Sequence, residues 1–222
     1  MSLLELHTRS LELAAAVVDT VQPEQLVLPT PCAGWSLRHL VEHMVGLHRG
    51  FAAAAAGAGP DPALWHGVPV HGVPVHGVPV HGDPVHGDPG GAFRHSAARL
   101  TAAFALAAAA PRPAPLRLPE VRDGAPVPFE RAVGFHLLDT LVHAWDVAVA
   151  LGPPDRLVAA VEGEPPLAEA LLAVAGAVPA AAPDRAPGRA FAAVRAVDGE
   201  AGPFGRALAL LGRDTAWAVA AR

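Results

Sequence analysis

The stretch from Glu130 to Leu151, ERAVGFHLLDTLVHAWDVAVAL, decides the fold of this chain. Apolar residues recur in it at helical spacing, and Gly152-Pro153-Pro154 ends the pattern, which predicts one long helix. One face carries Leu138, Leu141, Val142, Trp145 and Ala148. The opposite face carries His136, Asp139, His143 and Asp146 at i, i+3, i+7 and i+10. Val147 and Ala150 lie in or beside that polar sector, so the helix is apolar nearly all round. Such a helix is expected to be buried, and its polar side chains then need partners.

The polar stripe contains a candidate metal site. Asp139 and His143 lie one turn apart, where a carboxylate and an imidazole reach the same ion. A second helix is predicted from the N-cap Ser36 to about Ala56. It carries His43 at the edge of its apolar face, whereas His39 points further toward solvent. If the two helices are neighbours, His43, Asp139 and His143 converge and leave one coordination position open.

Simpler interpretations stand beside the metal site. A polar stripe on a helix is usually its solvated face, and His43 alone fits a hydrogen-bonded histidine at the edge of the core. Asp146 is a candidate partner that orients an imidazole, or it faces water. Cys32 precedes the second helix and is either a reactive thiol or inert. Trp35 and Trp145 are expected to pack in the core or at its edge.

The remaining elements indicate an all-α protein, an antiparallel helical bundle. Helices are expected at 3–21 and 92–110, and a hairpin at 116–129 around Asp123-Gly124. A further helix starts near Asp155, breaks at Pro165-Pro166 and resumes to about Val178. We expect one bundle domain over 1–178, and a linker with a short C-terminal helical appendage over 179–222.

Residues 66–90 form five tandem pentapeptides of the type His-Gly-x-Pro-x. Pro and Gly in every unit predict an extended, flexible loop inserted in the bundle. The evenly spaced histidines are His66, His71, His76, His81 and His86. Such a tract collects zinc, nickel or copper. The alternative is a repeat expansion tolerated in an exposed loop.

Composition narrows the classes of function. Hydrophobic residues make up 52% of the 222 residues and charged residues 17%, which is enough apolar material for a core. The net charge is −5 and there is no lysine, so no basic surface for nucleic acid is expected. No apolar run reaches the length of a membrane span, and the N-terminus lacks a signal pattern. One cysteine excludes an intramolecular disulfide. A cytoplasmic protein, monomeric or homodimeric, is expected.

Three motifs resemble those of one family. The motifs occur in the same order as in that family. The first is Thr30-Pro31-Cys32-Ala33-Gly34-Trp35-Ser36 with the start of the following helix up to His43. The second is Leu138 to Ala148, and the third is Leu211-Gly212-Arg213-Asp214-Thr215-Ala216-Trp217. The family is that of the DinB-like metal-binding bundles, in the actinobacterial branch related to the N-terminal domain of mycothiol-dependent maleylpyruvate isomerase. The resemblance covers roughly residues 1–160 and 204–217, with a gap at the repeats.

This resemblance implies a DinB-like four-helix bundle that holds a divalent metal, usually zinc, in its crevice. Its metal ligands match His43, Asp139 and His143; the isomerase has Glu where this chain has Asp139. The implied function is that of a metal-dependent thiol transferase or isomerase, with a mycothiol-type cosubstrate and a small-molecule substrate. Ni2+ is an alternative to Zn2+. Two other functions remain: a non-catalytic metal- or ligand-binding module whose His-rich loop collects metal, and a helical interaction protein.

Overall fold

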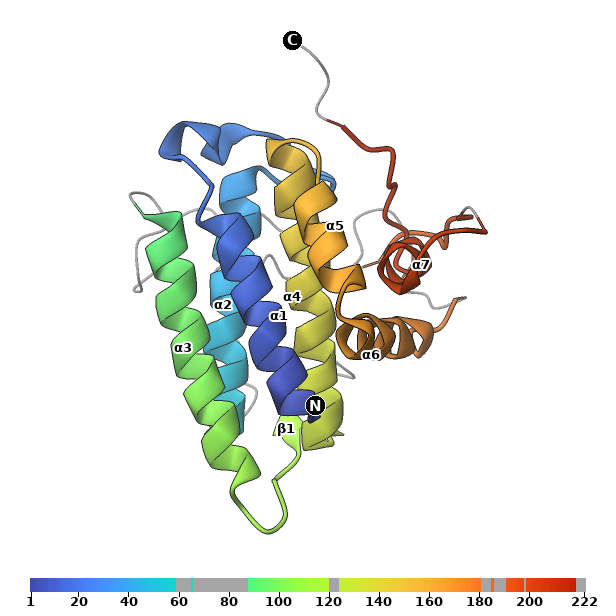
Figure 1. Ribbon diagram of the computed structural model, residues 1–222. Coiled ribbons are helices and arrows are strands. Elements are labelled where there is room, and N and C mark those ends of the chain that lie inside the picture. The colour runs from blue at the N-terminus through green and yellow to red at the C-terminus, as the bar shows by residue number, and fades with distance from the viewer. Residues whose placement is uncertain are drawn as a thin grey trace.

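A computed structural model describes residues 1–58, 65, 88–119, 124–180, 185, 191–197 and 199–218. Four long helices stand side by side and form the bundle (Figure 1). They are α1 (Leu3–Val18), α2 (Leu37–Ala55), α3 (Pro89–Ala108) and α4 (Phe129–Leu151). Helix α1 packs on α3 and α4, and α2 packs on the same two helices. The adjacency of α2 and α4, on which the predicted metal site depends, is therefore confirmed.

Shorter elements complete the chain. A 3-10 helix, η1 (Pro23–Val27), follows α1, and strands β1 (Leu116–Arg117) and β2 (Pro126–Val127) pair antiparallel before α4. Helices α5 (Asp155–Glu162), α6 (Pro165–Gly176) and α7 (Pro203–Leu210) lie on the far side of α4 from α3 (Figure 1). Among the described residues, no helix combines the length and the apolarity that a membrane crossing requires.

Several boundaries differ from the expected ones. Helix α1 ends at Val18 rather than near residue 21, and Thr20 turns back to the Val17 carbonyl before η1 begins at Pro23. Helix α3 begins at Pro89, inside the last pentapeptide, where we expected an extended loop. Asp88 is its N-cap and accepts a hydrogen bond from the Gly91 N–H at 2.7 Å. A proline at the first helical position lacks only an N–H that would be unpaired there anyway. The rest of the repeat, residues 66–87 with its five histidines, lies outside the described residues.

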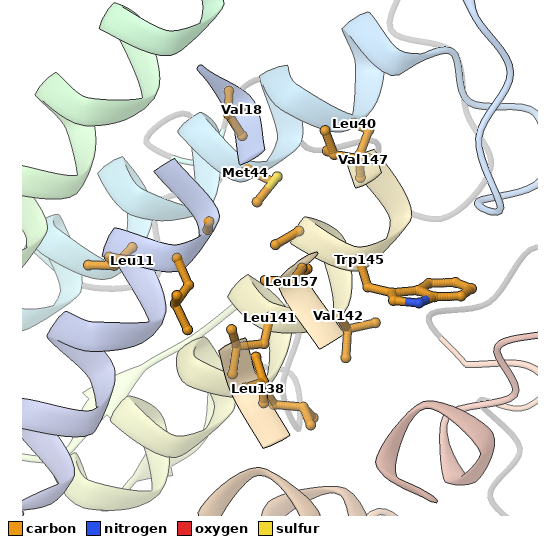
Figure 2. Packing of buried hydrophobic residues seen from close by; sticks show 14 of the residues in the cluster. Leu11, Val18, Leu40, Met44, Leu138, Leu141, Val142, Trp145, Val147 and Leu157 are labelled. Atoms are coloured by element: carbon orange, nitrogen blue, oxygen red, sulfur yellow. The ribbon is translucent and has the colours of Figure 1, made fainter. Parts of the chain in front are cut away.

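Helix α4 is the centre of the core. It is buried along almost its whole length, on the polar stripe as well as on the apolar face. Figure 2 shows its side chains Leu138, Leu141 and Trp145 in one cluster with residues of α1, α2 and α5. Phe204 and Leu208 of α7 belong to the same cluster, so the C-terminal helix shares the core of the bundle. The expectation that α4 is buried all round is confirmed.

Candidate metal centre

A short loop before α2 forms one wall of the candidate site. Gly34 adopts a φ of 81°, a left-handed conformation that glycine takes at low cost. The Thr30 side chain donates to the Trp35 carbonyl at 3.0 Å, and the Trp35 N–H donates to the Cys32 carbonyl at 2.9 Å. Ser36 then caps α2, accepting from the backbone N–H of His39. This tight turn presents Cys32 and Trp35 toward the polar stripe of α4.

Three side chains converge between α2 and α4 as the sequence predicted. His143 Nε2 lies 3.3 Å from Asp139 Oδ1, and His43 Nε2 lies 3.9 Å from the same oxygen. Both imidazoles are buried, whereas the Asp139 side chain keeps 31% of its surface exposed. One donor atom from each residue falls within 4.8 Å of the other two. The group is thus buried at its imidazoles and partly exposed at its carboxylate.

The three donors suit a divalent metal ion. Ligand atoms of a tetrahedral zinc ion, each about 2.0–2.1 Å from it, lie about 3.3–3.4 Å apart. The separations of 3.3 and 3.9 Å come close to this value. Two imidazoles and one carboxylate are a common donor set for zinc and for neighbouring transition metals. The residues present therefore fit the metal that the resemblance implies.

Electrostatics couple these three groups. Burial would raise the pKa of Asp139, but the adjacent His143 and His43 outweigh burial and hold this pKa well below its usual range. Burial would lower the pKa of His143, yet Asp139, Asp146 and Cys32 together raise it well above its usual value. Burial dominates at His43 and lowers its pKa. The cluster thus carries an ionised Asp139 carboxylate beside the two imidazoles.

Trp35 packs against the two candidate imidazole ligands. Its ring centroid lies 4.9 Å from that of His43, edge on, and 6.3 Å from that of His143, nearly parallel. The expected core-edge placement of Trp35 is confirmed, because the residue is partly buried against the main core. Trp145 is fully buried, as expected. His39 is exposed, and its ring hydrogen bonds with Ser36 at the start of its own helix.

The other ring nitrogen of His143 faces a second polar group. His143 Nδ1 lies 2.9 Å from Asp146 Oδ2, so Asp146 is a partner of the imidazole rather than a solvent-facing residue. The Cys32 thiol also donates to this carboxylate oxygen at 3.3 Å. Burial and the Asp146 charge raise the pKa of Cys32, against the opposing influence of His143 and Arg213. Cys32 therefore favours the neutral thiol, which argues against the interpretation as a reactive thiolate.

His136 shares the polar stripe of α4 with His143, but its side chain contacts a different set of residues. Its Nδ1 lies 3.0 Å from His7 Nε2 and 3.1 Å from the Thr140 hydroxyl. The ring of His48 lies 5.3 Å away, and His48 Nδ1 hydrogen bonds with Ser96 at 2.8 Å. The three imidazoles are buried deep in the bundle, between the aromatic rings of Phe51, Phe93 and Phe104. They form an interior histidine cluster, defined here as His7, His48 and His136.

Residues far apart in sequence were missed by pattern alone. His7 and His48 lie on α1 and α2 with no spacing that connects them to His136. The C-terminal motif gave no sign that Arg213 reaches α4, yet its guanidinium forms a two-pronged ion pair with Asp146. A buried carboxylate expected on α4 was the one available signal that a cation must come from elsewhere in the chain.

The bundle and its candidate site define a class: helical domains with a group of potential metal ligands between two neighbouring helices. Residues 7–148 match the family model described as mycothiol maleylpyruvate isomerase N-terminal domain, and the chain belongs to this family. Two uncharacterized proteins, from two strains of Mycobacterium tuberculosis, are each 30% identical to it over 214 residues, which is 96% of this chain and 98% of theirs.

A solved structure supports the fold. The crystal structure of the mycothiol-dependent maleylpyruvate isomerase superposes with a TM-score of 0.52 at 17% sequence identity. The match covers 80% of this chain and 69% of that one. The predicted family and the predicted fold class, a mostly helical DinB-like bundle with a two-stranded hairpin, are confirmed.

Proposed function

We propose that this chain binds one divalent metal ion, with zinc expected and nickel as the alternative, and uses it in a thiol-dependent transferase or isomerase reaction. The observation that carries the proposal is the convergence of His43 Nε2, Asp139 Oδ1 and His143 Nε2 between α2 and α4. Three protein ligands with an open fourth position are typical of catalytic rather than structural zinc.

Each residue of the crevice has a distinct part in this proposal. His43, Asp139 and His143 hold the ion, and a bound divalent ion lowers the pKa of a thiol or water at its open position. The exposed edge of Asp139 marks the side from which a substrate enters. Trp35 shields the two imidazoles from solvent, because its ring packs on both of them. Asp146 fixes the orientation of His143 through its Nδ1.

The thiol part of the proposal comes from the relatives. A solved structure with a similar fold is that of the mycothiol-dependent maleylpyruvate isomerase, and the description of the family model names mycothiol maleylpyruvate isomerase. A thiol of the mycothiol type is therefore the first cosubstrate to test, together with a small-molecule acceptor. The cytoplasmic location and the monomeric or homodimeric state stay predictions. The alternative is a non-catalytic metal- or ligand-binding module in which the histidine repeat collects the ion.

Metal content of the untagged full-length protein tests the binding step. The five repeat histidines are first replaced by Gln, so that any ion counted belongs to the bundle. We expect about one equivalent of zinc by mass spectrometry, lost in His43→Ala and kept in His39→Ala, an exposed position on the same helix. No bound metal would refute the proposal. Bound metal with no turnover of low-molecular-weight thiols would favour the non-catalytic module.

A further inference from the structure

His143 belongs to two groups of side chains that could hold a metal ion. The first is His43, Asp139 and His143, and the second is Cys32, His143 and Asp146. The first group uses Nε2 of the shared ring, which faces Asp139 at 3.3 Å. The second group uses Nδ1, which lies 2.9 Å from Asp146 and 3.9 Å from the Cys32 sulfur. An ion in either group needs a lone pair on a different nitrogen of the same imidazole.

A neutral imidazole offers only one lone pair. One of its ring nitrogens carries a hydrogen and donates, and the other accepts a hydrogen bond or binds a metal. Whatever keeps the hydrogen on Nδ1 of His143 directs the Nε2 lone pair toward Asp139 and His43. The partner of Nδ1 therefore decides which of the two groups can hold an ion.

Arg213 determines the state of that partner. Its Nε lies 2.9 Å from Asp146 Oδ1 and its second terminal nitrogen lies 2.8 Å from Asp146 Oδ2, a two-pronged ion pair. Asp146 is completely buried, and Arg213 is nearly so, with 12% of its side chain exposed. A buried carboxylate that accepts two charge-assisted hydrogen bonds from one guanidinium stays ionised, because the guanidinium keeps its proton. As a carboxylate, Asp146 can only accept, so His143 Nδ1 must donate.

The same guanidinium stands against a cation in the second group. A terminal nitrogen of Arg213 lies 3.6 Å from the Cys32 sulfur, so a divalent ion between Cys32 and Asp146 would meet a permanent positive charge at close range. Arginine remains protonated at all ordinary pH values, and in a buried site this repulsion is poorly screened. The carboxylate that would attract the ion is already neutralised by the arginine.

The C-terminal segment holds Arg213 in this position. Gly212 adopts a φ of 80°, and a Cβ there would lie 2.6 Å from the Cβ of Ala192. The Arg213 N–H donates to the Leu208 carbonyl at 2.9 Å, which closes the turn after α7. At the other end of α7, Glu162 accepts from the Phe204 N–H at 2.8 Å. Helix α7 is therefore tied to α5 at its start, and the turn that carries Arg213 is fixed by its own backbone hydrogen bond.

We propose that Arg213 is a positioning residue of the metal centre. Through Asp146 it keeps the hydrogen on Nδ1 of His143, so that the Nε2 lone pair is available to a metal ion held with His43 and Asp139. Its positive charge also excludes a metal ion from the group with Cys32. The C-terminal segment thereby becomes part of the site, although Arg213 lies 67 residues beyond Asp146 in the sequence. This inference rests on the metal binding proposed above.

Cobalt(II) is the probe that distinguishes the two groups, because a cobalt–thiolate bond gives an intense charge-transfer band in the near ultraviolet. The protein is the full-length chain with the repeat histidines replaced by Gln. We expect it to bind Co2+ without this band. Arg213→Met should weaken this binding about 10- to 100-fold, as loss of such a supporting partner does. It should also produce the sulfur band, and Cys32→Ser in the same protein should remove the band.

Two variants separate charge from general damage. Arg213→Lys keeps the positive charge and should show no sulfur band. Arg195→Met breaks the neighbouring but exposed ion pair with Asp214 and should leave both the cobalt spectrum and the affinity unchanged. An Arg213→Met protein that binds Co2+ with the parent affinity and spectrum would overturn the inference. So would a sulfur band in the parent protein.

A measurement without any arginine variant covers the case in which Arg213→Met does not fold. Long-range 1H–15N spectra of the zinc-loaded parent protein report the two ring nitrogens of His143, assigned with His143→Gln. We expect a protonated Nδ1 and a metal-shifted Nε2, and the reverse pattern would overturn the inference. Failure of the parent protein to bind any metal would instead contradict the proposed function, so the two failures are distinguishable.

Discussion

The interior histidine cluster predicts that this protein loses stability steeply in mild acid. Burial lowers the pKa of His7 to about 4. Burial, together with the nearby His7, lowers the pKa of His48 to about 3. Burial also lowers the pKa of His136 well below its usual value. In the unfolded chain the pKa of histidine is about 6.5. Between these limits the unfolded state binds protons that the folded state does not, so stability falls as the pH falls.

The magnitude follows from the number of groups. Below about pH 6 each buried neutral histidine costs about 1.4 kcal/mol of unfolding free energy per pH unit. The three together give about 4 kcal/mol per pH unit down to about pH 5. Domains of this kind have a total stability of about 5–15 kcal/mol. A decrease of one or two pH units therefore removes a large share of it.

Urea unfolding at pH 7, 6, 5.5 and 5 measures this slope. His48→Gln should reduce the slope by about 1.4 kcal/mol per pH unit, even if the variant is less stable at every pH. His39→Gln replaces an exposed histidine and should leave the slope as in the parent. His43 and His143, whose pKa values shift in opposite directions, are present in all of these proteins and cancel from the differences. An unchanged slope in His48→Gln would refute the reasoning.

Three further predictions concern the metal, the C-terminal turn and the core. Zinc at 100 times its dissociation constant should raise the unfolding free energy by about 2.7 kcal/mol in calorimetry or denaturant titration, and should not do so in His43→Ala. Gly212→Ala should cost about 1–3 kcal/mol, because its φ of 80° is strained for alanine and its Cβ meets Ala192. Gly176→Ala, in open space, is the control, and equal midpoints for both would contradict this. Trp145→Ala should cost about 3–5 kcal/mol, measured the same way, and a loss below 1 kcal/mol would contradict its place in the core.

Much of the architecture follows from local patterns in the sequence. The long apolar run with a polar stripe predicted α4 to within one residue at its start, and Ser36 marked the beginning of α2. Helix α3 begins earlier than expected, because Asp88 and Pro89 make a helix start out of repeat residues. Spacing on one helix also brought Asp139 and His143 together, since residues four apart always share a helix face.

The site beyond that pair depends on tertiary structure. His136 follows the same stripe as His143, but it joins His7 and His48 in the interior because it lies two turns away on α4, where the neighbouring faces of α1 and α2 are different. The sequence contained no signal for this division. A helix pattern states which residues share a face and leaves open which helix that face meets.

The sequence by itself determined the helical class, the family, the buried character of α4 and the candidate donors His43, Asp139 and His143. These depend on hydrophobic periodicity, capping and short motifs, which act within one or two turns of a helix. Only the tertiary structure decided that Asp146 is paired with Arg213, that Cys32 stays a thiol beside them, and that two ligand groups share His143. Such contacts join residues more than 60 positions apart, and they form because a buried charge must find its partner wherever the packed helices place one.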